Sequence, residues 1–358
     1  MNRPIYIKAP ARICLFGDHQ DYLGLPVIAC AIDKYITVEG KPNHSNFLNF
    51  NLKDLEKNIS IDLNDDLKEI EKGDHIKYVL KSLKKNKIVI NKGFDIKIKS
   101  EIFINAGISS SSALVVALIK FFLQIFNPEK ISEKFISELA YQSEVVEQGG
   151  SGGRMDQYSI TIGNTIFLET NTNNSFFKIK SPFRNFIIAN SGIKKQTDLV
   201  LKNLKEKSID SIKKIKRHNE SFVLSEVKKS EINLYNKFLD KTSFNYFEAA
   251  VSNHHITLSA LNELKKIKPD LNKLGRLMTE HHNFLKNNLK ITVPEIDQMI
   301  DIAIENGAYG AKIIGSGGGG SVLILSNENQ QDNIINKLIS AGIKEIVKAN
   351  ESPGILSL

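Results

Sequence analysis

Residues 104–113 read INAGISSSSA, and they separate a strand-like run from a strongly apolar, helix-like run. The first run is Phe94–Ile104 and the second is Ala113–Phe126. Gly107 lets the backbone approach a ligand closely, and a helix start behind the serines offers unpaired N–H groups and the positive end of the helix dipole. The segment indicates either a phosphate cradle or a strand-to-helix turn with a serine N-cap. Because one serine suffices for a cap, four in a row favour the cradle.

The composition is that of an ordinary globular protein, with 41% hydrophobic and 25% charged residues. A chain of 358 residues is too long for one compact pair of layers, so we expect two domains. The net charge of +8 comes nearly all from lysine. Its densest run, Lys202–Arg217, is interleaved with acids and lacks aromatic stacking residues. A solvated helix face therefore explains the charge better than a nucleic-acid surface.

The two cysteines of the chain, Cys14 and Cys30, both lie in apolar segments. Buried free thiols in a reducing compartment are the simplest explanation. The N-terminus shows no charged-then-apolar leader, and Lys120 interrupts the longest apolar run, so we expect neither a signal peptide nor a membrane span. We expect a cytoplasmic monomer or homodimer with no nucleic-acid or membrane partner.

A polar loop, GDHQDYLG at 17–24, lies near the N-terminus between apolar runs. These runs predict three strands, at Ile5–Ile7, Ile13–Phe16 and Val27–Ile32. In the loop, Asp18, His19 and Asp21 can present acceptors and a donor to a polyol. The alternative is an ordinary hairpin loop with an exposed histidine, since Asp also suits turns.

The middle of the chain alternates helix and strand signals. Helices are predicted at Asp74–Lys84, Ser132–Gln148, Lys194–Lys216 and over most of Glu231–Leu289, and strands at Gly93–Ser100 and Phe186–Ala189. The apolar stripe of the second helix consists of Ile136, Leu139, Ala140 and Val146. Glu144 falls outside this stripe. The glycine-rich turn Ser151–Tyr158 then leads to Asp156 and another β-like run. The pattern changes from about Arg184, which places a domain boundary near residue 185.

Two further features lie towards the C-terminus. Residues 310–322, GAKIIGSGGGGSV, predict a strand, a glycine turn and a strand, with a flexible hairpin as the alternative. The pairs His254-His255 and His281-His282 raise the hypothesis of a metal site. Adjacent helical residues point about 100° apart, so neither pair can chelate one ion from one face, and helix packing and capping are preferred.

Three motifs, in order, resemble those of the GHMP kinase superfamily of galactokinase, homoserine kinase, mevalonate kinase and phosphomevalonate kinase. Residues 8–24, KAPARICLFGDHQDYLG, resemble the galactokinase motif APGRVNLIGEHTDYNGG. Residues 104–113 resemble the second motif, GLGSSAA or GLSSSAA, and residues 310–322 the third. Asp-Tyr after the histidine points to the sugar kinases, and mevalonate kinases usually carry lysine where Arg12 stands.

The resemblance extends to a pair of acids. Galactokinases carry GIMDQ, in which the catalytic Asp stands twelve residues after a Glu that ligates Mg²⁺, and Asp156 stands twelve after Glu144. Departures from the family pattern concern the sugar. Asp18 replaces the usual Glu and is one methylene shorter, which could shift which sugar hydroxyl is reached. Residues 190–197 resemble a sugar-kinase segment, but a tyrosine that contacts the sugar in galactokinases has no counterpart.

The resemblance implies an α+β, two-domain GHMP kinase fold. It places an N-terminal ribosomal-protein-S5-domain-2-like domain at 1–185 and a C-terminal ferredoxin-like α/β domain at 186–358. It implies an ATP-dependent kinase for a small-molecule sugar, phosphorylating the anomeric (C1) hydroxyl of a hexose such as galactose or a related sugar. The alternatives are a kinase for mevalonate or for a uronic acid, pentose or heptose phosphate, and a catalytically silent galactokinase-like sensor. A further alternative, an RNA-binding protein, is supported by fold analogy and basic charge alone.

Site residues are implied in the same way, with ATP and Mg²⁺ as cofactors. Asp156 would accept the hydroxyl proton, and Arg12 would keep it ionised and stabilise the γ-phosphoryl group. Ser111 and Glu144 would hold Mg²⁺. The sugar would contact Asp18, His19, Asp21 and Gly153. The residues implied for ATP are Gly107, Ile108, Ser109, Ser110, Ser111, Ser112, Gly315, Gly317 and Gly318.

Overall fold

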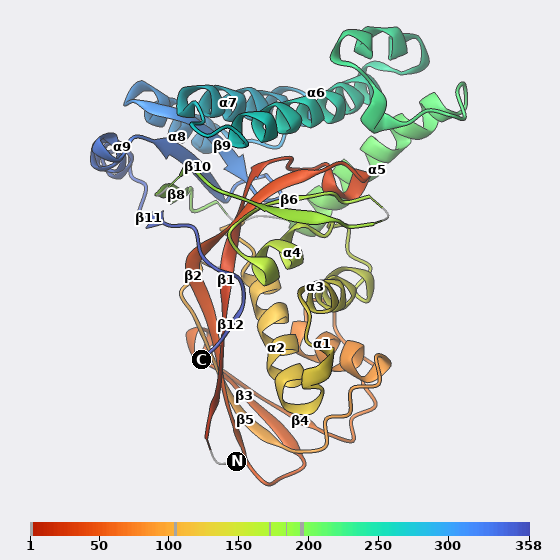
Figure 1. Ribbon diagram of the computed structural model, residues 1–358, viewed down its shortest axis with the longest axis vertical. Coiled ribbons are helices and arrows are strands. Elements are labelled where there is room, and N and C mark those ends of the chain that lie inside the picture. The colour runs from red at the N-terminus through yellow and green to blue at the C-terminus, as the bar shows by residue number, and fades with distance from the viewer. Residues whose placement is uncertain (1–2, 104–105, 172, 184, 194–196) are drawn as a thin grey trace.

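The computed structural model describes residues 3–103, 106–171, 173–183, 185–193 and 197–358, which form two sheets with their helices (Figure 1). The strands of the first sheet are β1 Ile5–Phe16, β2 Val27–Pro42, β3 Phe47–Leu52, β4 Lys57–Asp62, β5 Phe94–Ser100, β6 Thr165–Leu168, β7 Phe176–Ile179 and β12 Leu356–Ser357. Their order is β12-β1-β2-β5-β3-β4, with β6 paired to β2 and β7 to β6. The pairs are antiparallel except for β3 with β5.

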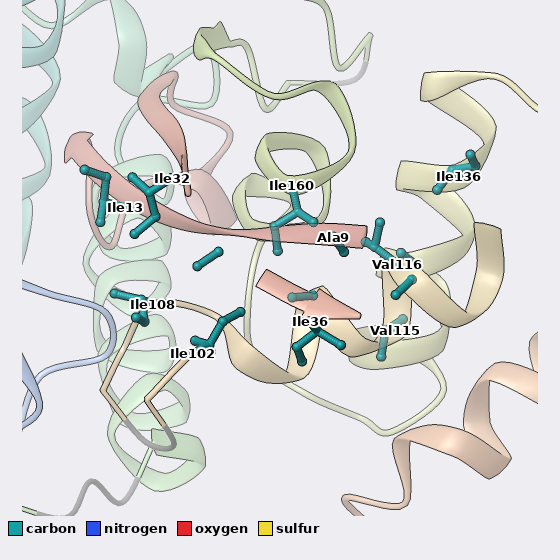
Figure 2. Close-up of a cluster of buried hydrophobic side chains, with 14 of the residues drawn as sticks. Ala9, Ile13, Ile32, Ile36, Ile102, Ile108, Val115, Val116, Ile136 and Ile160 are labelled. Atoms are coloured by element: carbon teal, nitrogen blue, oxygen red, sulfur yellow. The ribbon is translucent and has the colours of Figure 1, made fainter. Parts of the chain in front are cut away.

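Helices packed on this sheet bury its apolar face. They are α1 His75–Lys85, α2 Ser110–Phe126, α3 Glu133–Tyr141 and α4 Met155–Ile162. Helix α2 is apolar around most of its circumference, which suits a helix enclosed by the sheet and its neighbours. β5 alternates buried and exposed residues, as expected for a strand with one solvated face. Figure 2 shows part of this core, including Val115 and Val116 of α2 beside Ala9 of β1.

The second sheet has the order β11-β8-β10-β9. Its strands are β8 Phe186–Asn190, β9 Ala308–Ile314, β10 Ser321–Ser326 and β11 Glu345–Ala349, and the helices of this part of the chain are α5 Thr197–Lys216, α6 Lys241–Leu264, α7 Leu271–Asn287, α8 Pro294–Glu305 and α9 Glu328–Ser340. After β11 the chain returns to the first sheet, where β12 pairs with β1 (Figure 1).

Most predicted elements are present. The helix at 74–84, the strands at 93–100 and 186–189, and the strands flanking the glycine turn at 310–322 are confirmed. Helix α5 covers the predicted helix from residue 197, whereas residues 194–196 lie outside the described residues, as do Ile104, Asn105 and Arg184. The division into 1–185 and 186–358 stays a prediction.

The N-terminal strands are longer than predicted. Ile5–Ile7 and Ile13–Phe16 belong to one strand, β1, and β2 continues ten residues past Ile32. The register of the two strands shifts between Pro10 and Ala11. A bulge accommodates a proline that cannot donate to the ladder, so the interruption read from the sequence is a local irregularity within a continuous strand.

The prediction that Val146 belongs to the apolar stripe of the helix at 132–148 is wrong. Helix α3 changes to a π-turn at Gln142–Val146. The wider turn shifts the register of the following side chains. Val146 is therefore 54% exposed, whereas Val145 is buried.

The prediction of a β-like run directly after the glycine-rich turn is also wrong, because the chain there forms helix α4. Asp156 lies in the first turn of helix α4. The β-branched sequence of this helix disfavours it locally, but Ser159 and Thr161 donate hydrogen bonds to the carbonyl oxygens four residues before them. Burial of the helix against β1 and β2 overrides the local preference.

Cys14 and Cys30 are buried free thiols, as predicted. Among the described residues, no helix combines the length and the apolar character that crossing a bilayer requires.

Helix α7 packs so closely on β9 that their backbones touch. A Cβ atom on Gly275 would lie 2.0 Å from the carbonyl oxygen of Tyr309, and one on Gly310 would lie 2.0 Å from that of Gly275. Gly275→Ala is therefore expected to lower the free energy of unfolding by about 2 kcal/mol or more. Helix propensity alone predicts the opposite sign, a gain of about 1 kcal/mol. Urea denaturation measures the change.

The control is Arg276→Ala, an exposed neighbour on the same helix. This substitution is expected to change stability by no more than about 0.5 kcal/mol. A Gly275→Ala variant that is as stable as the wild type would disprove the close backbone contact.

Candidate active site

A cavity of about 690 Å³ brings together segments that lie far apart in the sequence. It is lined by β1, the loop that follows β1, the start of α2, the π-turn, the glycine-rich turn before α4, and the beginning of the turn after β9. Of the predicted site residues, those on its lining are Arg12, Asp18, His19, Asp21, Gly107, Ser109, Ser110, Ser111, Ser112, Glu144, Gly153, Asp156 and Gly315. Ile108, Gly317 and Gly318 are not on the lining.

An ion pair between Arg12 and Asp156 occupies the centre of the cavity. Arg12 Nε donates to Asp156 Oδ1 at 2.8 Å and Nη2 to Oδ2 at 2.7 Å, the two-pronged geometry that a guanidinium and a carboxylate favour. The third nitrogen, Nη1, donates to the carbonyl oxygen of Gly107 at 2.8 Å. Arg12 is buried, whereas the Asp156 side chain is 28% exposed. The exposed edge of the carboxylate is thus available to a ligand.

The structure tests one of the two alternatives that the sequence of the serine-rich segment left open, the serine N-cap. Ser109 occupies the N-cap position of α2 with a φ of 62°, but its side chain caps no helix N–H group. Its hydroxyl donates instead to Asp156 Oδ2 at 2.5 Å. The helix start, with Ser110, Ser111 and Ser112 on the cavity lining, therefore presents its N–H groups without a side-chain cap. The serine cap is therefore wrong, and Asp156 lies beside the uncapped helix start; the anion cradle stays a prediction.

The side chain of Ile108 belongs to the core and does not line the cavity. Its side chain is buried, and its carbonyl oxygen accepts a hydrogen bond from the Arg12 N–H at 3.3 Å. The backbone of β1 thereby holds the segment in place.

Glu144 lies on the π-turn and accepts a hydrogen bond through Oε2 from Gln157 Nε2 at 2.7 Å. Ser111 lines the same cavity. Within the described residues, no cluster of three or more His, Cys, Asp and Glu side chains forms a metal site. One carboxylate and one hydroxyl nevertheless match Mg²⁺ in kinases, which binds few protein ligands and completes its shell with phosphate oxygens and water.

The loop after β1 holds its acids in two different ways. Asp18 is buried, and its Oδ2 lies 2.5 Å from Nζ of Lys312 on β9. Burial disfavours the charged form of Asp18, but the charge and hydrogen bond of Lys312, together with His281 and His19, outweigh it, so the pKa of Asp18 lies below its ordinary value. Asp21 instead accepts hydrogen bonds from the backbone N–H groups of Tyr22 at 2.9 Å and Met155 at 3.4 Å.

Asp21 is held in an environment that opposes its ionisation. Burial raises the pKa of Asp21 to about 6, and the negative charge of Asp156 adds to the rise. Gly153 allows this arrangement, because a Cβ atom at that position would lie 2.0 Å from Asp21 Oδ2. His19 is also buried on this loop, with a φ of 61°.

The first residues of the glycine turn after β9 line the cavity, and the next ones pack against the segment before α8. Gly315 and Ser316 line the cavity. Gly317 lies against Ile291, since a Cβ atom there would come within 2.5 Å of the Ile291 Cβ. The Gly318 N–H donates to the Ile291 carbonyl oxygen at 2.7 Å. The turn is therefore anchored on the segment before α8, as expected for a rigid turn.

Two features at or next to the cavity were given no role from the sequence. Lys312 lies in an apolar strand, where a lysine between Ala311 and Ile313 was the one available signal. Part of the cavity lining is apolar and includes Ile36, Leu52, Leu55, Ile98, Phe103 and Leu114, with Asp54 and Ser100 on the same lining. No local motif marks this part, because its residues come from separate strands, a 3₁₀ turn, a loop and a helix.

The histidine pairs pack in helices, as predicted. His282 Nδ1 accepts a hydrogen bond from the Ile313 N–H at 3.4 Å, and a ring nitrogen of His255 contacts the Val227 carbonyl oxygen at 2.8 Å. Burial lowers the pKa of His281 to about 3. It also lowers the pKa of His254 to about 4.

Comparison with known proteins finds three matching family descriptions. Residues 74–164 match the N-terminal domain of GHMP kinases, and residues 258–344 match the C-terminal region of GHMP kinases. Residues 1–42 match the galactokinase galactose-binding signature.

Similar curated proteins include kinases of two kinds. Mevalonate kinase of Methanocaldococcus jannaschii is 31% identical, over 93% of this chain and 95% of the relative. Galactokinase of Thermococcus kodakarensis is 24% identical, over 92% of this chain and 91% of the relative.

Solved structures confirm the fold expected from the sequence. Lactococcus lactis galactokinase complexed with galactose has a TM-score of 0.90 at 22% identity, covering 99% of this chain and 95% of that chain. Mevalonate kinase of Methanococcus jannaschii has a TM-score of 0.71 at 28% identity, covering 98% and 99%. At 22% identity the first likeness concerns the fold alone.

The raised pKa of Asp21 makes its contribution to stability depend on pH. Because the folded-state pKa of about 6 exceeds the ordinary 3.8, ionisation of Asp21 lowers the free energy of unfolding as the pH rises from about 4 to 6. Asp21→Asn removes this cost. It is expected to raise the free energy of unfolding at pH 7.5 by about 1–3 kcal/mol, a gain that vanishes near pH 4. Urea denaturation across this range measures it.

Asp301→Asn on the exposed side of α8 is the matched control. Its effect on the free energy of unfolding is expected to be the same across this pH range. A stability gain in Asp21→Asn that is equal at pH 4 and pH 7.5 would contradict the assignment of the cost to the Asp21 charge.

Proposed function

Because this chain belongs to the GHMP kinase family of ATP-dependent phosphotransferases, we propose that it is a galactokinase-type sugar kinase. It transfers the γ-phosphoryl group of ATP to the anomeric (C1) hydroxyl of a neutral hexose, such as galactose or a related sugar. The galactose-binding signature at residues 1–42 and the galactokinase relatives support the sugar.

The observation that carries the proposal is the position of Asp156. Its carboxylate contacts both Arg12 and the Ser109 hydroxyl, so a base and an anion cradle face the same space. A kinase needs this juxtaposition, because its main task is to align the attacking oxygen with the phosphoryl group.

The proposed reaction follows from these contacts. Asp156 accepts the proton of the sugar hydroxyl while the sugar oxygen forms a bond to the γ-phosphorus. The bond from that phosphorus to the bridging oxygen breaks, and ADP leaves. Arg12 and the N–H groups at the start of α2 stabilise the negative charge on the transferring group. The adenine base lies at the apolar part of the cavity lining, which includes Leu52 and Phe103.

Mg²⁺ belongs to the proposal as a cofactor held by Glu144 and Ser111, whose oxygen atoms suit a hard cation. When bound, it neutralises charge on the phosphate oxygens. Gln157 orients the Glu144 carboxylate for this role through the hydrogen bond to Oε2.

Charge balance at the sugar end favours a neutral substrate. Arg12 lines the cavity and Lys312 lies behind Asp18, and each is already paired with an acid, Asp156 and Asp18 respectively. Asp21 adds a further carboxylate. A uronic acid, a sugar phosphate or mevalonate would bring another negative charge next to these acids, which is unfavourable in a partly buried site.

Phosphorylation of mevalonate is the second candidate. The mevalonate kinase relative at 31% identity over 93% of this chain favours it. A silent sensor that binds ATP and sugar without turnover is the third, and it conflicts with the presence of Asp156, Ser109 and Glu144 around one cavity.

The proposal places the kinase in the cytoplasm. Two buried free thiols agree with a reducing compartment, in which a small-molecule kinase also finds its ATP.

An acceptor panel tests the proposed function directly. ADP release is coupled to an indicator reaction with galactose, other neutral hexoses, pentoses, galacturonate, heptose phosphates and mevalonate. We expect the highest kcat/KM with a neutral hexose and, by phosphorus NMR of the product, phosphate on C1. A tenfold preference for mevalonate or another anionic acceptor would reject the sugar assignment, and the absence of turnover would favour the sensor.

Asp156→Asn is expected to lower kcat by about 10²–10⁴-fold, because the amide cannot accept the hydroxyl proton. ATP affinity, measured by calorimetry with a non-hydrolysable analogue, is expected to stay within about twofold, since the cradle is formed by α2. Asp301→Asn serves as the control. Undiminished turnover in Asp156→Asn would remove Asp156 from the role of base.

A further inference from the structure

Lys312 is a fully buried lysine in the middle of β9. Its Nζ lies 2.5 Å from Asp18 Oδ2 and donates a hydrogen bond to the carbonyl oxygen of Cys14 at 3.0 Å. Cys14 is 298 residues away in the sequence. One side chain of the second sheet therefore reaches both β1 and the loop that follows it.

Stability is a weak explanation for such a pair. Withdrawing two charges from water costs about as much as their attraction returns, so buried ion pairs are often replaceable by apolar side chains without loss. The removal of one partner is costly, because it leaves the other charge buried and unpaired. A buried pair that connects two sheets acts mainly on geometry.

The geometry concerns the site. Asp18 lines the cavity, and so do Gly315 and Ser316, which directly follow β9. The same strand therefore carries Lys312 and enters the glycine turn. Through Lys312 the position of this strand is tied to that of the Asp18 carboxylate.

Burial raises the pKa of Asp18, Lys312 provides the largest opposing effect, and His281 and His19 add to it. His281 on α7 is fully buried, and burial lowers its pKa to about 3, so it is neutral near pH 7. Its two ring nitrogens have no hydrogen-bond partner among the described residues. Arg12, the next cation, is bound by Asp156 through two hydrogen bonds.

We propose that Lys312 is a positioning residue for the acceptor substrate: it holds the Asp18 carboxylate charged and oriented, so that Asp18 accepts a hydroxyl of the bound sugar. This inference rests on the proposed function, in which Asp18 contacts the sugar. Lys312 itself touches neither substrate. Its effect on binding passes through Asp18, and ATP binding at the α2 end is independent of it.

The test is a double-mutant cycle of Lys312→Met and Asp18→Asn, with KM measured separately for acceptor and ATP. Lys312→Met is expected to raise the acceptor KM at least tenfold and to leave the ATP KM within twofold. In the Asp18→Asn background the same substitution is expected to change the acceptor KM less than twofold, because the group that Lys312 orients is gone. Lys312→Arg, which keeps the charge, is expected to recover part of the acceptor affinity.

Lys348→Met is the matched control. Lys348 lies on β11, at the opposite edge of the same sheet from β9, and forms an exposed ion pair with Asp332. Equal rises in both KM values, or an equal effect of Lys312→Met in both backgrounds, would overturn the inference. If circular dichroism shows that Lys312→Met does not fold, the double variant, which buries no unpaired charge, is compared with Asp18→Asn. An acceptor KM more than tenfold higher in the double variant would then refute the role.

The wild-type panel separates this inference from the proposed function. If the wild type prefers another alcohol, the sugar assignment fails, and the cycle is repeated with that alcohol as acceptor. If the wild type turns nothing over, galactose binding by calorimetry replaces KM, with the same expected ratios.

Discussion

The ion pair between Arg12 and Asp156 is the interaction on which the rest of the site depends. Arg12 lies on β1, a long strand that pairs with β2 and β12 in the first sheet, and Asp156 lies at the start of α4. The same guanidinium holds the Gly107 carbonyl oxygen, and the Arg12 N–H holds that of Ile108. One residue on a long strand therefore locates the proposed base and the proposed anion cradle relative to each other. Such preorganisation is the main contribution that a protein makes to phosphoryl transfer.

Charge is balanced unevenly around this centre. Asp156 and Asp18 each have a basic partner, whereas Asp21 is held by backbone N–H groups next to the Asp156 charge. The fold thus keeps one acid in an unfavourable place, with a pKa of about 6. An acid that costs stability at neutral pH is typical of a residue retained for binding. The cavity lining thus combines acids with apolar side chains, and the proposed function assigns the acids to an acceptor alcohol and the apolar part to a nucleotide base.

Much of the fold was predictable because its signals are local. Alternation at 94–100, the apolar run of α2 and the glycine turn at 315–320 each define an element within a few residues. Predictions were wrong where long-range packing decides the local conformation. Helix α4 forms from a β-branched sequence because burial and hydroxyl hydrogen bonds override its preference, and the π-turn that exposes Val146 has no signature in the spacing of apolar residues.

The sequence by itself determined the family, the three motifs and the types of residue available for chemistry, since these depend on short segments and their order. Tertiary structure alone decided that the Ser109 hydroxyl turns to Asp156 and not to the helix, and that a lysine inside an apolar strand meets Asp18. The physical reason is the distance along the chain. Arg12 and Asp156 are 144 residues apart, and Lys312 and Cys14 are 298 apart. Local propensity carries no information about contacts at such separations, which arise only when the chain has folded.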